Sequence, residues 1–358
     1  MEKLGIVGLP NSGKSSLFNA LTGGSALVAP HPFSTTETTV GVAQVPDQRV
    51  DQLGLMSSSR KVVHATVEFV DIAGLVAGAS TGEGLGNRFL AGIREADALC
   101  LVLRGFEDDN VVGDHDPLSD LGVLELELVL ADAATVDSQV EKRRKAAKTD
   151  KSLAGEVVAL ERAKAELDSG VPIYRSSLSA EDRSLLKSFF LLTNKPVLAV
   201  VNLGEDQVSG ADAIVKPVAD ELGGHGDVLG VSVKLEAEAA QLESSERTEL
   251  LEGLGLGEGA LPRVARAAYH LLGRRTFFTT GDKESRAWTF RAGAKAPECA
   301  GVIHSDLQRG FIRAEVIHWD ELLQLGSWHA AKEAGKLRVE GKEYEVVDGD
   351  VLEIRFNV

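Results

Sequence analysis

The sequence has few cysteines, no long apolar run and no excess of basic residues, and each absence excludes a class of protein. Two cysteines in 358 residues are too few for a disulfide framework and lack the spacing of a metal site, so we expect free thiols in a reducing cytoplasm. No stretch approaches the ~18 apolar residues that span a bilayer. A strand-like run already starts at Leu4, so we expect no signal peptide and a cytoplasmic location.

A surplus of positive charge is also missing, since 38 basic residues stand against 54 acidic ones and leave a formal net charge of −16. Because such a surface repels nucleic acid as a whole, the composition excludes a generally basic nucleic-acid binder, and we expect no sequence-specific DNA partner. A local basic patch stays compatible with this charge, although such runs more often form the solvated face of a helix. The candidate run comprises Lys142, Arg143, Arg144 and Lys145, followed by Lys148 and Lys151.

A chain of this length is too long for one ordinary core and indicates two or three domains. Short apolar runs alternate with polar or helical segments up to about residue 114, and the same pattern returns near residue 193. This alternation is typical of a mostly parallel α/β sheet. The expected strands are Leu4–Val7, Thr66–Val70, Ala98–Leu103, Lys195–Val201 and Asp227–Val231, with Cys100 as a core residue.

The segment between these two parts has the charged, alanine-rich composition that is typical of exposed helices. Leucine and alanine recur at three- and four-residue spacing on either side of a polar break at 148–151, which predicts an antiparallel coiled-coil hairpin inserted into the first domain. The two stripes are Leu121, Leu124, Leu128 and Ala131, and then Leu153, Val157, Leu160, Ala163 and Leu167.

The last region, from about residue 274, favours a compact β-rich domain. Aromatic and β-branched residues alternate with turns there, and Asp348-Gly349-Asp350 is a tight-turn signal between the last two expected strands. One helix, Trp319–Leu325, is expected, with Cys299 in a loop. The expected strands start near Arg274 and continue at Ala287–Phe290, Phe311–Val316, Tyr344–Val347 and Val351–Phe356.

The strongest motif is Gly8–Ser15, a complete G-x-x-x-x-G-K-S phosphate-binding loop between a strand-like run and a helix-like run. Backbone N–H groups and the helix N-terminus would bind the β-phosphate. Lys14 would act in catalysis by reaching the β- and γ-phosphates, and the Ser15 hydroxyl would ligate Mg²⁺. The motif predicts a nucleoside triphosphate site that includes Asn11, Ser12, Gly13, Lys14, Ser15 and Ser16.

A second magnesium anchor follows the strand that ends near Val70. Asp71 and Gly74 form a D-x-x-G motif, in which Asp71 would hold Mg²⁺ through water and the Gly74 N–H would contact the γ-phosphate. Thr35 would complete the metal shell, with the neighbouring Thr36 as the alternative. Leu75 stands where Ras-like enzymes carry a glutamine that orients water, so another group or an added ion must assist hydrolysis.

Two further segments bear on the mechanism. The glycine-rich stretch Ala77–Gly86 is expected to order and disorder with the nucleotide state, unless it is simply a surface loop. Asn11 offers a neutral oxygen beside the phosphates, and we hypothesise that it holds K⁺, which would add positive charge at the transition state.

The base-selecting loop departs from the Asn-Lys-x-Asp pattern that recognises guanine. This chain has Asn202-Leu203-Gly204-Glu205 after a strand, so the longer glutamate would meet the base differently and the lysine that packs along the base is absent. Strict guanine recognition is therefore expected to be impaired. The segment Ser232-Val233-Lys234 follows the next strand and completes the base loop.

Together these motifs closely resemble the Obg-like ATPases of the YchF family. The resemblance covers nearly the whole chain, and it rests on Gly8–Ser15, Pro32–Thr35, Asp71–Arg88, Asn202–Glu205 and Ser232–Leu242. The C-terminal region resembles the family's TGS domain, a β-grasp module, through Arg286–Thr289, Gly301–His304, Arg309–Val316 and Arg355–Val358.

The resemblance implies an α/β fold: a GTPase-like P-loop NTPase domain with an inserted antiparallel coiled-coil hairpin and a C-terminal β-grasp (TGS) domain. It places the nucleotide domain at 1–114 and 193–273, the insertion at 115–192 and the TGS domain at 274–358. It further implies slow hydrolysis of ATP, preferred over or comparable to GTP, and association with the ribosome. In that family the N-x-x-E loop contacts adenine, which corresponds to Asn202, Leu203 and Glu205 here.

Several positions depart from the family's usual pattern. His31 and the run Thr36–Thr39 differ in the first switch, while Gly105 and Gly113–His115 differ without an obvious functional role. The sequence thus predicts a Mg²⁺-dependent, ribosome-associated ATPase switch. Two alternatives stay open: a GTP-preferring enzyme, and a scaffold with negligible turnover whose bound nucleotide only orders a partner-binding surface.

Overall fold

The computed structural model describes residues 2–23, 27–28, 39–72, 85–108 and 115–357. The expected switch residues Thr35 and Gly74, together with Leu75, lie outside these ranges. The chain divides into two compact units, of which unit 1 is Met1–Ala43 with Glu68–Leu272 and unit 2 is Gln44–Val67 with Gly273–Val358. The sequence had assigned 44–67 to the nucleotide domain, whereas their contacts group them with the C-terminal region.

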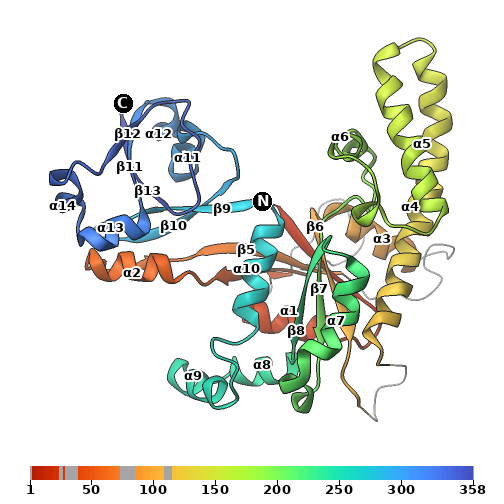
Figure 1. Cartoon of the computed structure of the whole chain (residues 1–358), viewed down its shortest axis with the longest axis horizontal. Coiled ribbons are helices and arrows are strands. Elements are labelled where there is room, and N and C mark those ends of the chain that lie inside the picture. Colours follow the sequence, from red (N-terminus) through yellow and green to blue (C-terminus); the bar gives the residue numbers. More distant parts are fainter. Residues whose placement is uncertain (1, 24–26, 29–38, 73–84, 109–114, 358) are drawn as a thin grey trace. The chain divides into compact units, whose positions relative to one another are not determined.

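Unit 1 is organised around a seven-stranded sheet with the order β2-β3-β5-β1-β6-β7-β8 (Figure 1). From β5 through β1, β6 and β7 to β8, each strand is parallel to the next, while β2 and β3 pair antiparallel. The five strands expected from the sequence are confirmed. The bounds are β1 Lys3–Gly8, β2 Leu27–Val28, β3 Thr39–Val45, β5 Ala65–Asp71, β6 Ala98–Arg104, β7 Val197–Asn202 and β8 Gly226–Val231.

The sheet is buried because β6 and β7 carry continuous apolar runs, as strands covered on both faces do. One core cluster joins α3, α4 and α7 to the odd-numbered side chains of β6 and β7, such as Leu101 and Ala199. Cys100, on the opposite face of β6, is fully buried as expected. The helices of this part are α1 Lys14–Thr22, α3 Leu85–Glu95, α7 Ala211–Leu222, α8 Val233–Ala239, α9 Ser244–Gly253 and α10 Leu261–Leu271.

The predicted insertion is a helical hairpin made of α4 Pro117–Ala147 and α5 Ala154–Asp168, which lie side by side in Figure 1. The assignment of its seam was wrong in part. Leu121, Leu124 and Leu128 pack into the core of the sheet, whereas the seam of α4 against α5 uses Val129, Val136 and Val140. The reason is that α4 is long enough to cover the sheet with its first half and to meet α5 with its second.

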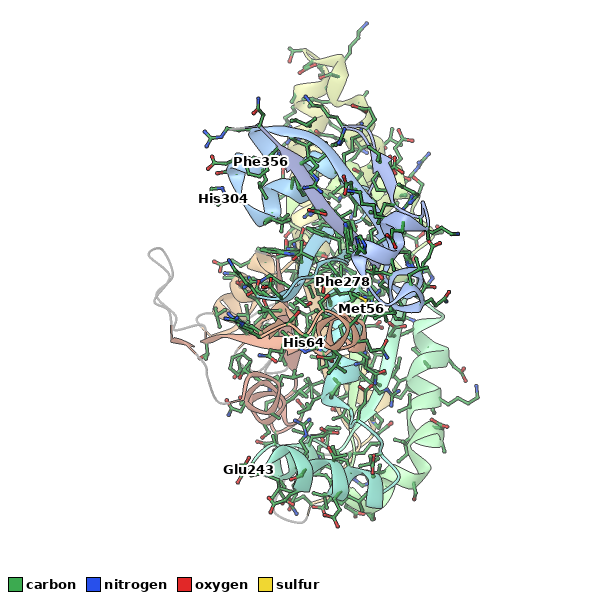
Figure 2. All side chains as sticks on the ribbon, turned by 90° about the vertical axis from the view of Figure 1, so that its left-hand side faces the viewer. Met56, His64, Glu243, Phe278, His304 and Phe356 are labelled. Carbon is green, nitrogen blue, oxygen red and sulfur yellow. The ribbon has the colours of Figure 1, made fainter. Side chains whose placement is uncertain are left out.

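Unit 2 contains a six-stranded sheet with the order β12-β11-β13-β9-β10-β4. The short strand β4 and the helix α2 come from the segment 44–67, and β4 pairs with β10. Arg49 of α2 lies over the ring of Phe278, a buried residue labelled in Figure 2, with 5.1 Å from its guanidinium carbon to the ring centroid. The strands are β4 Val62–Val63, β9 Arg274–Thr279, β10 Ser285–Arg291, β11 Phe311–His318, β12 Arg338–Glu340 and β13 Asp350–Phe356.

Three expectations for this region need correction. The run Tyr344–Val347 is no strand and contributes only a single bridge, between Glu345 and Lys295. Cys299 lies buried inside a helix instead of a loop, because its apolar neighbours pack against the sheet. The region also contains more than the one expected helix, although α13 has the predicted bounds. The helices of unit 2 are α2 Gln48–Met56, α11 Ala296–Ile303, α12 Ser305–Arg309, α13 Trp319–Leu325 and α14 Trp328–Glu333.

Over the described ranges, every helix is too short or too polar to cross a bilayer. Nor does this part of the chain bring together three histidine, cysteine or acidic side chains in the way a protein metal cage requires.

Candidate functional site

The phosphate-binding loop joins the end of β1 to the first turn of α1. Asn11 and Gly13 have φ angles of 63° and 94°, so two left-handed residues curl the backbone before the helix begins at Lys14. Only glycine fits at position 13, because a Cβ there would lie 2.2 Å from Nδ2 of Asn202. The loop is thus held in shape by its own glycine and by a side chain that comes from β7.

Lys14 lies inside the loop instead of extending into solvent. Its Nζ donates a hydrogen bond of 2.9 Å to the carbonyl oxygen of Leu9, and the residue is only 8% exposed. Burial lowers the pKa of the Lys14 ammonium, and the carboxylate of Asp71 partly opposes this shift. A desolvated ammonium near the loop backbone interacts strongly with an anion that enters the loop.

The predicted metal-binding residues Ser15 and Asp71 lie together. The Ser15 hydroxyl at the start of α1 donates to Oδ2 of Asp71 at the end of β5, with a distance of 2.9 Å. Burial raises the pKa of Asp71, while the Ser15 hydrogen bond and the charge of Lys14 act in the opposite direction. A hydroxyl and a carboxylate are the hard oxygen donors that Mg²⁺ prefers. The pair therefore fits a magnesium ion.

Asn202 connects the phosphate loop to the base loop. Its Nδ2 donates to the carbonyl oxygen of Ser12 at 3.0 Å, and its Oδ1 accepts from the backbone N–H of Val233 at 3.2 Å. The side chain is buried, and it is positioned by the pairing of β7 between β6 and β8. The sequence had assigned Asn202 to the base alone, whereas the structure also makes it a link between three segments.

Of the remaining residues of the base loop, some are buried and others are exposed. Leu203 is 3% exposed and belongs to the core of the sheet. Ser232 is buried, and its hydroxyl has no hydrogen-bond partner among the described residues. Glu205 lies at the surface, where its Oε1 accepts from Nζ of Lys234 at 2.8 Å. Of the predicted N-x-x-E residues, Asn202 thus faces the phosphate loop and Glu205 the solvent side.

Sequence reasoning missed two residues that shape this loop. Gln207 accepts a hydrogen bond of 2.7 Å from the backbone N–H of Gly204, which closes the turn before α7. Gly105 donates its N–H to the carbonyl oxygen of Asn202 at 2.8 Å, and a Cβ at position 105 would lie 3.3 Å from that oxygen. This contact gives a structural reason for a glycine that had no apparent role. Only the pairing of β6 with β7 brings Gly105 to Asn202, so no local sequence motif could have indicated this contact.

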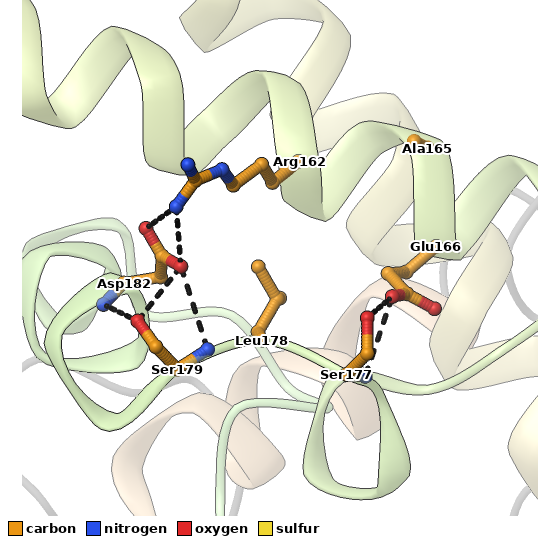
Figure 3. Close-up of a pocket in the computed structure, with 7 residues that line it drawn as sticks. All are labelled: Arg162, Ala165, Glu166, Ser177, Leu178, Ser179 and Asp182. Carbon is orange, nitrogen blue, oxygen red and sulfur yellow. Dashed lines mark hydrogen bonds and ion pairs between the residues drawn. The ribbon is translucent and has the colours of Figure 1, made fainter.

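A cavity of about 400 Å³ lies in the helical insertion and is shown in Figure 3. Its charged groups already bind one another. Arg162 pairs with Asp182 at 2.9 Å, and Glu166 accepts a hydrogen bond from the Ser177 hydroxyl. These contacts anchor α5 to the segment that follows it, so we assign this cavity a structural role and place the candidate site at the phosphate loop.

Comparisons with known proteins match both parts of the chain. A family model described as "50S ribosome-binding GTPase" matches residues 3–124, and the model YchF-GTPase_C, described as "Protein of unknown function (DUF933)", matches residues 275–357. The "Ribosome-binding ATPase YchF" of Bacillus subtilis (strain 168) is 47% identical over 361 residues, and that of Escherichia coli O157:H7 is 44% identical over 362. Each alignment covers 99% of both chains.

A solved structure gives the same result. The chain is similar to the Schizosaccharomyces pombe YchF GTPase, with a TM-score of 0.86, 34% sequence identity and coverage of 99% of this chain and 97% of that one. The sequence relatives and the structural relative thus agree over the full length.

Proposed function

The chain belongs to the YchF family, and from this premise we propose that it is a Mg²⁺-dependent ATPase that acts as a ribosome-associated regulatory switch in the cytoplasm. The observation that carries the proposal is the meeting of Lys14, Ser15 and Asp71 at one end of the parallel sheet. Ligands of open α/β sheets bind at this end, outside the carboxyl ends of the parallel strands. Relatives named ribosome-binding ATPases support the choice of partner.

The metal would be held by Ser15 and Asp71, with Thr35 as the third predicted contact. When bound, Mg²⁺ neutralises charge on the phosphates. Lys14 would exchange its hydrogen bond with the Leu9 carbonyl for one with a phosphate oxygen, and the Gly74 N–H would hold the γ-phosphate. Leu75 supplies no hydrogen bond to water, so we infer slow turnover.

We infer that adenine is preferred over guanine, or bound comparably, because the carboxylate at the base loop is engaged elsewhere. Guanine recognition needs both carboxylate oxygens for its N1–H and 2-amino groups, whereas Oε1 of Glu205 already accepts from Lys234. Both side chains are well exposed, so this ion pair weakens guanine binding without blocking it. The buried position of Leu203 is consistent with the absence of a lysine stacked along the base.

Titration of the purified chain with ATP and with GTP, each with Mg²⁺, tests this selectivity. We expect a Kd for ATP equal to or below that for GTP. A Kd for GTP well below that for ATP would overturn the preference and favour the GTPase alternative. A Glu205→Asp variant provides the matched comparison, since a shorter side chain should release the Lys234 pair and shift the ratio toward GTP.

A scaffold with negligible turnover is the second candidate, and Leu75 is the observation that favours it. Single-turnover hydrolysis of ATP, measured with and without ribosomes, separates the two. The switch requires faster hydrolysis on ribosomes or a ribosome affinity that depends on the nucleotide. If both quantities stay constant, the scaffold is the better description.

We further propose that Asn11 holds K⁺ beside the phosphates. The side chain is exposed at the mouth of the loop, on a left-handed residue that turns it away from the core. A cation there would add positive charge at the transition state, in a site where Leu75 cannot orient water. We expect hydrolysis in KCl to exceed that in NaCl by about tenfold or more, since a single electrostatic contact to a transition state contributes at least this much. The Asn11→Ala variant should lose the difference, and equal rates of the native chain in both salts would refute the site.

A further inference from the structure

We propose that the tip of the α4–α5 hairpin binds the phosphate backbone of RNA through four lysines: Lys142, Lys145, Lys148 and Lys151. We name these residues the tip lysines. The inference rests on the proposed association with the ribosome, and it adds the contact surface and its chemistry. It also gives a role to the basic run that the nucleotide site does not use.

The hairpin divides its basic residues into two groups. Along its length they form ion pairs within the insertion: Arg143 pairs with Glu156 at 3.2 Å, Arg144 with Glu161 at 2.7 Å, and Lys164 with Asp137. These pairs fasten α4 to α5. The tip lysines differ, because each is exposed and none forms an ion pair with the described part of the chain. Their charge is therefore free for a partner.

The tip is a local exception to the charge of the protein. Residues 142–151 contain six cations and one carboxylate in a chain of net charge −16. The single carboxylate, Asp150, accepts from the backbone N–H and the hydroxyl of Ser152, at 3.0 and 2.6 Å, and so caps the short helix that starts the return. These hydrogen bonds lower the pKa of Asp150. It acts as a turn residue and leaves the lysines as the cations of the tip.

The tip lysines are presented on a rigid support. Val136 and Val140 of α4 are buried against Leu160 and other residues of α5, up to within one turn of Lys142. The three-residue spacing from Lys142 to Lys145 places both on one face of α4. Figure 1 shows the turn between α4 and α5 at the end of the hairpin opposite to the sheet. The tip lysines therefore lie at the end of the hairpin that is remote from the sheet, where an extended acidic partner could reach them.

The composition of the tip favours RNA over a protein partner. Protein interfaces are enriched in aromatic residues and depleted in lysine at their centre. Between residues 141 and 153 the structure exposes no large apolar side chain, so the tip has lysines and no apolar anchor. Lysines without base-reading groups bind phosphates by charge and do not select sequence.

A charge-matched pair of variants tests the proposal in the full chain. The tip variant changes Lys142, Lys145, Lys148 and Lys151 to Gln, and the control variant changes the exposed lysines Lys187, Lys283, Lys332 and Lys342 to Gln. Binding to purified ribosomes is measured at 50–200 mM NaCl with one fixed nucleotide. We expect the tip variant to bind roughly tenfold or more weakly at low salt, and the slope of log K against log salt to fall by about 3, since each lost phosphate contact removes ~0.7–0.9. The control variant should behave like the native chain.

The outcomes separate this inference from the proposed function. If the native chain does not bind ribosomes in any nucleotide state, the ribosomal role fails and the inference fails with it. If the native chain binds and the tip variant equals the control, the inference alone is overturned. If the tip variant binds more weakly than the control, a photo-crosslinking residue at the exposed Thr149, between the lysines, identifies the partner. Products that RNase removes support the proposal, and products with ribosomal protein overturn it. ATP hydrolysis and the Tm of the tip variant should match the native values, because the tip lysines form no ion pairs.

Discussion

Replacing Lys14 with Met is expected to slow ATP hydrolysis by at least about 10²–10³-fold, with a Tm equal to or above that of the native chain. The rate falls because the variant lacks the ammonium that meets the developing negative charge, and loss of one such electrostatic contact has this size. Met keeps the apolar stem that packs in the loop. Single-turnover hydrolysis measures the rate, and thermal unfolding without nucleotide measures the Tm.

The stability of this variant follows from the direction of the pKa shift. Burial lowers the pKa of Lys14 in the folded protein below the ordinary lysine value. For such a group the folded state binds fewer protons, so stability increases with pH between the folded and the unfolded pKa, and at pH 7 the charged ammonium destabilises the fold. Removing the charge removes this cost. The Leu9 carbonyl keeps a partner, since it also accepts from the backbone N–H of Ser12 at 3.3 Å.

Lys195 provides the matched control. It is likewise a lysine whose pKa is lowered by burial, and it donates to main-chain carbonyls, those of Arg94 and Ala96. It lies away from the phosphate loop, at the other end of the strands. Lys195→Met should therefore leave the hydrolysis rate of the folded protein unchanged. If Lys14→Met retained more than a tenth of the native rate, Lys14 would have no direct role in the reaction.

The parts of this protein that could be predicted from sequence are those in which the cause is local. The phosphate loop is specified by a glycine at position 13 and by the strand and helix on either side of it, all within 20 residues. The strands β6 and β7 could be predicted because full burial on both faces leaves a continuous apolar run. The meeting of Ser15 with Asp71 also followed, since Asp71 ends β5 and the loop that leads to Ser15 follows the carboxyl end of the neighbouring parallel strand β1.

The errors arise where the partner of a residue is distant in the chain. Leu121 and Val136 carry the same helical spacing, yet one packs on the sheet and the other on α5. The sequence of the segment 44–67 predicts a part of the first domain. In the structure its strand β4 pairs with β10, which lies more than 200 residues later in the chain. The helix that contains Cys299 reads as a loop because it opens with Ala-Pro-Glu, a sequence that starts a helix as readily as a turn. Periodicity identifies the face of an element, while tertiary contact decides what that face meets.

At the functional site, Asn202 likewise has partners that are distant in the sequence, Ser12 and Val233. Its replacement is the second variant for which we expect a large effect. Asn202→Ala removes both hydrogen bonds of a buried side chain and leaves the Ser12 carbonyl and the Val233 N–H without that partner. Each unpaired buried group costs ~1–3 kcal/mol. We expect the free energy of unfolding without nucleotide to fall by about 2–4 kcal/mol, which denaturant titration measures.

The same variant should also lose nucleotide affinity, because Asn202 holds the phosphate loop and the base loop in one arrangement. A loss of ~1.4 kcal/mol raises Kd tenfold, so we expect the Kd for ATP to rise at least about tenfold, measured by calorimetry below the unfolding midpoint. Asn194→Ala is the control: its side chain also makes two hydrogen bonds, both to Arg183, but it lies where the helical insertion ends, before β7 begins. If the two variants were destabilised equally and only Asn202→Ala lost affinity, the link between the loops would be responsible. If Asn202→Ala bound ATP as the native chain does, the two loops would keep their arrangement without it.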